Sequence, residues 1–123
     1  MNVRFYKAAQ KEFDSAVEYY ETQLSGLGSR YRHEVLDCLA RIKLFPDSYA
    51  LISKRTRRCL VSKFPYGIIY QATSDEIIVV AVAHIHQRPD YWVPRIRKVS
   101  FGLFFRRGLT QSGNPWVLVM GRP

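Results

Sequence analysis

The sequence lacks the features that would place it in a membrane or outside the cell. It has no run of 18 or more apolar residues, the length that a membrane-spanning helix needs. Its opening, "MNVRFYKAAQKEFDS", does not have the charged-then-apolar layout of a signal peptide. We therefore expect a protein that is made and kept in the cytosol, with no membrane partner.

Cysteine is scarce, and nucleotide-binding and nucleophile motifs are missing. Cys38 and Cys59 are the two cysteines, and neither lies in a C-x-x-C pair, so buried free thiols are the simplest interpretation. No glycine-rich phosphate loop and no glycine-framed nucleophile turn occurs. His84 and His86 form an H-x-H pair that has no carboxylate or cysteine at ligand spacing. We therefore expect neither a metal nor a cofactor.

Acidic residues are scarce in the second half of the chain. Residues 1–53 hold seven Lys and Arg against seven Asp and Glu, whereas from residue 54 onward twelve basic residues face only Asp75, Glu76 and Asp90. The whole net charge of +9 therefore lies in the second half. Such a field attracts phosphate or an acidic protein, and the alternative is a solvated basic surface that keeps the protein soluble.

The residues that are present predict one folded domain with two helices. The hydrophobic content of 47% is enough for a single core in 123 residues. Apolar residues recur at steps of three and four from Ala9 to Leu24 and again from Tyr31 to Phe45. The glycines of "SGLGS" between them predict a tight connection, so the two helices should form an antiparallel hairpin.

Strand patterns surround this hairpin. Alternating or continuous apolar runs predict strands, and the intervening "PDSYALISK" is expected to be a loop. The predicted strands are "NVRFY", "RTRRCLVSKF", "YGIIYQAT" and "DEIIVVAVAHI". The order β-α-α-β-β-β predicts an α+β fold, with the helical hairpin on one face of a small, mostly antiparallel sheet. After residue 99 the pattern is broken by glycines, and "WVLVM" is the one further candidate strand.

The stretch "AVAHIHQRPDYW", residues 81–92, holds the first candidate site. Alternation groups its side chains into two faces, and we expect Ala81, Ala83 and Ile85 on the helix-covered face and Val82, His84 and His86 on the other. Because Pro89 cannot donate a ladder hydrogen bond, the strand should end near Arg88 and place it at the rim of the second face. The competing interpretation is that both histidines are structural.

Cations and aromatic rings are interleaved around this stretch, as single-stranded nucleic acid requires. The basic run contributes Lys54, Arg55, Arg57, Arg58 and Lys63, and the rings are those of Tyr66, Tyr70, Tyr91 and Trp92. Such rings are as often core residues. The same residue types are those of metal-independent RNA cleavage, with a base, stabilising cations and an acid. A basic nucleic-acid-binding module without catalysis remains the alternative.

The order of motifs resembles the RelE/ParE superfamily of toxins from type II toxin-antitoxin (plasmid stabilisation type) systems. The resemblance rests on "AVEYYE", "GLGSRYRHEVLDCLARI", "RRCLVSKFPYGIIYQ" and "IIVVAVAHIHQRPDYWVPR", and it covers about residues 3–97. It implies the same helical hairpin on a small sheet, with residues 1–98 as the toxin domain and residues 99–123 as a C-terminal extension.

The resemblance implies a growth-inhibiting toxin but leaves two targets open, because members similar to RelE cut mRNA on the ribosome and members similar to ParE block DNA gyrase. Endonuclease members carry an arginine on the third strand, where this chain has Gly67. The catalytic candidates are Arg88, His84, His86 and Tyr91. The target-binding candidates are Arg55, Arg57, Arg58, Lys63, Tyr70 and Arg95. The expected partners are a cognate acidic antitoxin and either gyrase or ribosome-bound mRNA.

Overall fold

The order of helices and strands follows the sequence patterns closely. The computed structural model describes residues 2–96. Its elements are β1 (Asn2–Phe5), α1 (Lys7–Gln23), α2 (Leu27–Leu44), β2 (Ala50–Leu51), β3 (Arg57–Leu60), β4 (Tyr66–Ala72) and β5 (Glu76–His84). Two helices and a small sheet confirm the predicted α+β class. Neither helix of the described part is long and apolar enough to cross a membrane.

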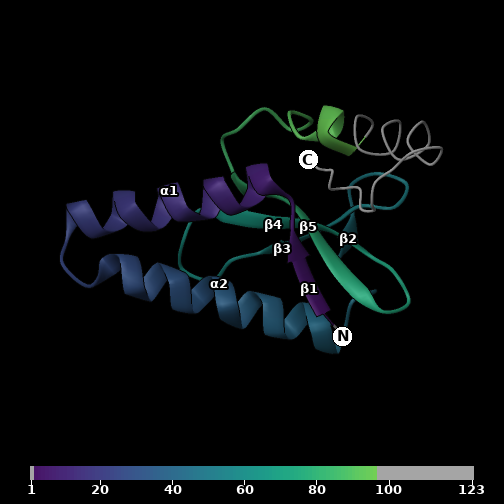
Figure 1. Ribbon diagram of the computed structural model, residues 1–123, viewed down its shortest axis with the longest axis horizontal. Coiled ribbons are helices and arrows are strands. Elements are labelled where there is room, and N and C mark those ends of the chain that lie inside the picture. Colours follow the sequence, from purple (N-terminus) through teal and green to yellow (C-terminus); the bar gives the residue numbers. More distant parts are fainter. Residues whose placement is uncertain (1, 97–123) are drawn as a thin grey trace, which may run out of the picture.

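The two helices pack as the apolar spacing predicts, and they run antiparallel beside the sheet (Figure 1). Phe13 on α1 and Tyr31 on α2 are buried, with ring centroids 6.1 Å apart. The connection turns at Gly26, whose φ of +88° favours glycine. The Glu21 carboxylate accepts hydrogen bonds from the backbone N–H groups of Gly26 and Gly28, at 2.9 and 3.0 Å. A carboxylate at this helix start satisfies otherwise unpaired donors and opposes the helix dipole.

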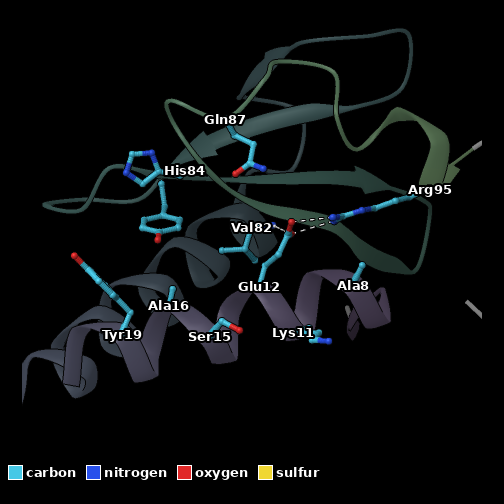
Figure 2. Close-up of a pocket in the computed structure, with 11 residues that line it drawn as sticks. Ala8, Lys11, Glu12, Ser15, Ala16, Tyr19, Val82, His84, Gln87 and Arg95 are labelled. Atoms are coloured by element: carbon cyan, nitrogen blue, oxygen red, sulfur yellow. Dashed lines mark hydrogen bonds and ion pairs between the residues drawn. The ribbon is translucent and has the colours of Figure 1, made fainter. Parts of the chain in front are cut away.

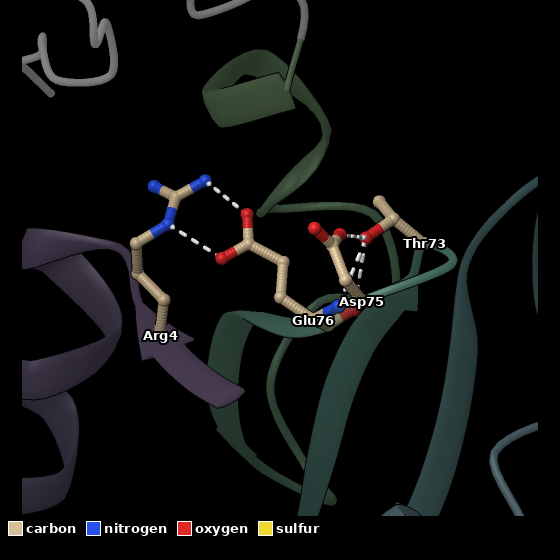
Figure 3. Close-up of polar contacts among 4 residues, drawn as sticks. All are labelled: Arg4, Thr73, Asp75 and Glu76. Atoms are coloured by element: carbon tan, nitrogen blue, oxygen red, sulfur yellow. Dashed lines mark hydrogen bonds and ion pairs between the residues drawn. The ribbon is translucent and has the colours of Figure 1, made fainter. Parts of the chain in front are cut away.

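The sheet has the strand order β1-β5-β4-β3-β2. β1 runs parallel to β5, and the other neighbouring pairs are antiparallel. An ion pair joins the two parallel strands, because the Arg4 guanidinium donates to both carboxylate oxygens of Glu76, at 3.3 and 3.2 Å (Figure 3). The long β5 is buried from Ile77 to Ala83, as its central place in the sheet requires.

The turn between β4 and β5 is closed by Thr73. Its hydroxyl accepts a hydrogen bond from the backbone N–H of Glu76 at 3.1 Å and donates to the Asp75 carboxylate at 3.2 Å (Figure 3). The backbone N–H of Thr73 also bonds the Glu76 carbonyl. A turn at Ser74 and Asp75 therefore joins the two predicted strands, and local side-chain bonding to the backbone closes it.

Several element boundaries differ from the prediction. β3 covers only Arg57–Leu60 of the predicted strand "RTRRCLVSKF". The segment expected to be a loop contains β2, a two-residue strand that pairs with Arg57 and Arg58 at the sheet edge. The last strand ends at His84 and not near Arg88. It stops there because the chain turns, and the His84 side chain accepts a hydrogen bond from the backbone N–H of His86 at 3.1 Å. The expected strand at "WVLVM" lies outside the described residues.

The assignment of the two faces of β5 was wrong. Val82 and His84 face α1, since both line a groove together with residues of that helix. Their cross-strand partners agree, because His84 pairs with Tyr66, whose ring contacts Tyr31 on α2 at 5.2 Å. Ala83 instead pairs with Gly67 on the face away from the helices. Both faces of β5 are apolar, so alternation separates them without showing which one the helices cover.

A close approach of the two helices at Gly28 predicts an effect on stability. A Cβ atom added at Gly28 would lie 2.6 Å from the Val17 carbonyl oxygen, a backbone atom that cannot move away by itself. In an open helix, Gly→Ala stabilises by about 1 kcal/mol. Here we expect Gly28→Ala to lower the free energy of unfolding by about 1–3 kcal/mol through overpacking.

The measurement is urea unfolding of the full chain, with Ser29→Ala at the neighbouring exposed position as the matched control. The control should be unchanged or slightly more stable. A Gly28→Ala protein as stable as its Ser29→Ala counterpart would contradict the close packing.

Candidate functional site

A groove of about 420 Å³ runs between α1 and β5, and polar side chains line both of its walls (Figure 2). Helix α1 forms one wall, and β4, β5 and the chain that follows them form the other. The lining residues are Ala8, Lys11, Glu12, Ser15, Ala16, Tyr19, Tyr66, Val82, His84, Gln87 and Arg95. The groove is therefore the place where a catalytic candidate, His84, and a target-binding candidate, Arg95, lie on one surface.

Three rings gather at one end of the groove, where His84 and Tyr66 line it and His86 adjoins His84. The His84 ring lies 5.1 Å from the Tyr66 ring and 5.2 Å from the His86 ring, centroid to centroid. Because the Nδ1 atom of His84 accepts a hydrogen bond from the His86 backbone, the neutral imidazole carries its proton on Nε2. Burial is the largest cause that raises the pKa of Tyr66. The expected proximity of His84 and His86 is therefore present, at the end of β5.

The other end of the groove is dominated by Glu12. Its carboxylate accepts two hydrogen bonds from the Arg95 guanidinium, at 3.0 and 2.8 Å, and one from the Tyr91 hydroxyl at 2.7 Å. The guanidinium also lies 5.0 Å from the centre of the Tyr91 ring. Burial first, and the bond to Glu12 second, raise the pKa of Tyr91 well above its ordinary value. Glu12 thus fixes two predicted site residues in one cluster.

The same cluster completes the edge of β5. β1 ends at Phe5, which pairs with Val79, so the later part of β5 has no strand on that side. There the Glu12 carboxylate accepts a hydrogen bond from the Val82 backbone N–H at 2.9 Å, and Arg95 donates to the Val80 carbonyl at 3.0 Å. Two side chains therefore satisfy backbone groups that a neighbouring strand would otherwise pair.

Comparison with known proteins decides the family. Residues 3–91 match the family described as the ParE toxin of type II toxin-antitoxin system, parDE. The chain belongs to the ParE toxin family. Membership in a toxin-antitoxin family implies an antitoxin partner, and it confirms the resemblance drawn from the motifs.

The fold of this ParE-family chain is also similar to a solved structure titled "Chromosomal ParDE TA system from P. aeruginosa". The two chains are 12% identical and superpose with a TM-score of 0.58, over 68% of this chain and 95% of that one. Identity this low shows the shared fold alone. No curated protein matches the sequence significantly.

The predicted basic residues of this ParE-family chain lie in different environments. Arg55 and Arg58 are exposed, and the stem of Arg58 lies against the face that Gly67 leaves bare. Arg57 instead donates to the Tyr49 carbonyl at 2.8 Å. Lys63 lies in the turn before β4, 3.8 Å from the Glu34 carboxylate. The basic run therefore does not form one continuous face.

Two further predicted residues lie away from the groove. Tyr70 is fully buried, and its hydroxyl donates to the Pro46 carbonyl at 2.6 Å. Burial raises its pKa to about 12. Arg88 lies beyond the end of the strand, 76% exposed, with its guanidinium 3.3 Å from the Asp90 carboxylate. Tyr70 thus packs inside the domain, whereas Arg88 is presented to solvent.

Glu12 is the residue of the groove that the sequence analysis missed. A signal was present, since Glu12 lies three residues after Ala9 and four before Ala16, on the buried stripe of α1. A carboxylate on an apolar helix face requires a partner from elsewhere in the chain. Within residues 2–96 no group of three or more His, Cys, Asp or Glu side chains is placed to hold a metal ion.

The Glu12 cluster predicts a large and specific loss of stability. Glu12→Gln removes the charge that Arg95, Tyr91 and the Val82 N–H group share, and it leaves the partly buried Arg95 without its counter-ion. We expect the free energy of unfolding to fall by about 2–3 kcal/mol. Chemical unfolding measures this, with Glu18→Gln on the exposed side of α1 as the control, which should change stability by less than about 0.5 kcal/mol. Equal effects of the two changes would contradict a structural role for the cluster.

Proposed function

We propose that this ParE-family toxin inhibits growth by binding DNA gyrase in the cytoplasm, without catalysing a reaction. The observation that carries the proposal is the Glu12 cluster, which engages the side chains of Tyr91 and Arg95. A general acid or a phosphate-stabilising cation must reach the substrate to act. Both side chains are instead bonded to a carboxylate of the same protein.

The remaining catalytic candidates also favour an inhibitor without catalytic activity. Position 67, on β4, is a glycine, where the resemblance places an arginine in endonucleases. Arg88 lies outside the strand and pairs with Asp90, so the predicted cations place only Arg95 in the groove, where Lys11 of α1 is the further cation of the lining. Cleavage of a phosphodiester needs positive charge at the phosphorane as well as proton transfer.

The exposed cations suit recognition of an acidic surface. Arg55 and Arg88 project from loops and Arg58 projects from β3, next to the edge strand β2. Charged groups of this kind speed association and set orientation more than they add affinity. An acidic antitoxin segment that covers them would neutralise the toxin by the same complementarity.

Cleavage of ribosome-bound mRNA is the second candidate, favoured by the His84, His86 and Tyr66 rings at one end of the groove. A histidine with a free Nε2–H group beside a tyrosine is a reasonable acid-base pair. A basic nucleic-acid-binding module without toxicity is the third account. It relies on the exposed cations alone.

Two parallel assays separate these accounts. Purified full-length protein is added to gyrase with relaxed plasmid, and separately to translating ribosomes with a defined mRNA. We expect supercoiling to stop while the mRNA stays intact. Cut mRNA with normal supercoiling would overturn the proposal in favour of the nuclease. No effect in either assay, together with no arrest of growth on expression, would leave the binding module.

Arg88 provides a sharper test within the gyrase assay. Because its side chain is exposed and its ion pair with Asp90 is open to solvent, Arg88→Ala should leave the free energy of unfolding within about 0.5 kcal/mol. Inhibition of gyrase should weaken at least about tenfold, the loss expected for one desolvated charged contact. Arg30→Ala, at another exposed cation near the start of α2, is the control and should inhibit normally. Full inhibition by the Arg88→Ala protein would show that Arg88 is not part of the gyrase-binding surface.

A further inference from the structure

Two thiols meet inside the protein, between α2 and β3. The Sγ atoms of Cys38 and Cys59 are 3.1 Å apart, closer than two sulfur atoms that are merely in contact. Cys38 is 0% and Cys59 1% exposed, and neither forms a disulfide. A disulfide bond is about 2.05 Å long, so an approach of about 1 Å separates this pair from one.

The hydrogen bond between the two thiols gives them different roles. The Cys38 thiol donates its hydrogen bond to the sulfur of Cys59, and this bond is the largest cause that lowers the pKa of the Cys59 thiol. Arg41, one turn along α2 from Cys38, lowers it further. For Cys38 the bond to Cys59 and burial raise the pKa. Cys59 is therefore the nucleophilic sulfur, with Cys38 as the thiol that resolves its oxidised form.

We propose that Cys38 and Cys59 are a dithiol that closes to a disulfide and ties α2 to β3, and that hydrogen peroxide reaches this buried pair when α2 and β3 open locally. In the first step Cys59 releases its proton to solvent, its thiolate attacks one oxygen of hydrogen peroxide, the O–O bond breaks, and sulfenic acid and hydroxide form. The Cys38 thiol then loses its proton to that hydroxide, giving water, and its sulfur displaces the second hydroxide from Cys59. That hydroxide takes up the proton that Cys59 released and leaves as water. Two thiols and one peroxide become one disulfide and two waters, and an external dithiol reverses the change.

The position of the pair gives the bond a structural consequence. It would close the loop from residue 38 to residue 59, which holds the end of α2, β2 and the connection to β3. Linking two elements of the core removes freedom from the unfolded chain. Oxidation should therefore make the toxin more resistant to unfolding.

The test uses the full chain under native conditions, treated with hydrogen peroxide and then analysed by intact mass, thiol titration and peptide mapping. We expect a loss of about 2 Da, no titratable thiol, and a cross-linked peptide that joins Cys38 to Cys59. The melting midpoint should rise by about 5–10 °C and return after dithiothreitol. Retained thiols, a disulfide between two chains, or sulfinic acid as the main product would each overturn the proposal.

Single variants test the assigned roles. With dimedone present, Cys38→Ala should be labelled on Cys59, whereas Cys59→Ala should stay unlabelled after the same exposure. Arg41→Gln should slow disulfide formation about tenfold with the same end product, and Arg30→Gln on the same helix should react at the normal rate. Equal labelling of the two single variants would show that Cys59 is not the more reactive thiol and would overturn the assigned roles. The wild-type mass and peptide map decide the disulfide itself even if a variant fails to fold.

Discussion

The carboxylate of Glu12 is the contact on which the arrangement around the groove depends. It joins α1 to the uncovered edge of β5 through the Val82 N–H group, and to the returning chain through Tyr91 and Arg95. β1 is too short to pair all of β5, so backbone groups there need other partners. The Glu12 carboxylate satisfies the Val82 N–H group and the Arg95 guanidinium satisfies the Val80 carbonyl, so no further strand is needed. The cost of burying the carboxylate is offset because its bonds to several donors form together.

This arrangement limits what the groove can do. A carboxylate that holds an arginine and a tyrosine keeps negative charge where a phosphate substrate would have to approach. Releasing either donor would leave Glu12 partly buried and short of partners, which costs free energy. The groove is therefore better suited to stabilise the fold at this end than to bind an anionic substrate there, and the histidine end is its chemically open part.

The sequence predicted the parts of the fold that local pattern determines. The helical hairpin, β1 and the β4–β5 turn follow from periodicity and turn residues. β2 has two residues, too few for any alternation to register. The prediction of which face of β5 the helices cover was wrong, because both of its faces are apolar. The position of Glu12 against Arg95 depends on residues 83 apart, which no local pattern reveals.

The basic residues in the second half of the chain fall into two groups, those that bond within the fold and those that are exposed. Arg57 donates to a backbone carbonyl and Arg95 to a carboxylate and a carbonyl, so part of the formal excess serves the fold. Exposure, and not net charge, separates these from Arg55 and Arg58. Within residues 2–96, an approaching partner therefore meets fewer cations than the sequence counts there, and the exposed ones include Arg55 and Arg58 at β3 and Arg88 after β5. Recognition by an acidic protein surface needs only such a local cluster, whereas tracking a nucleic acid backbone needs a continuous row of cations.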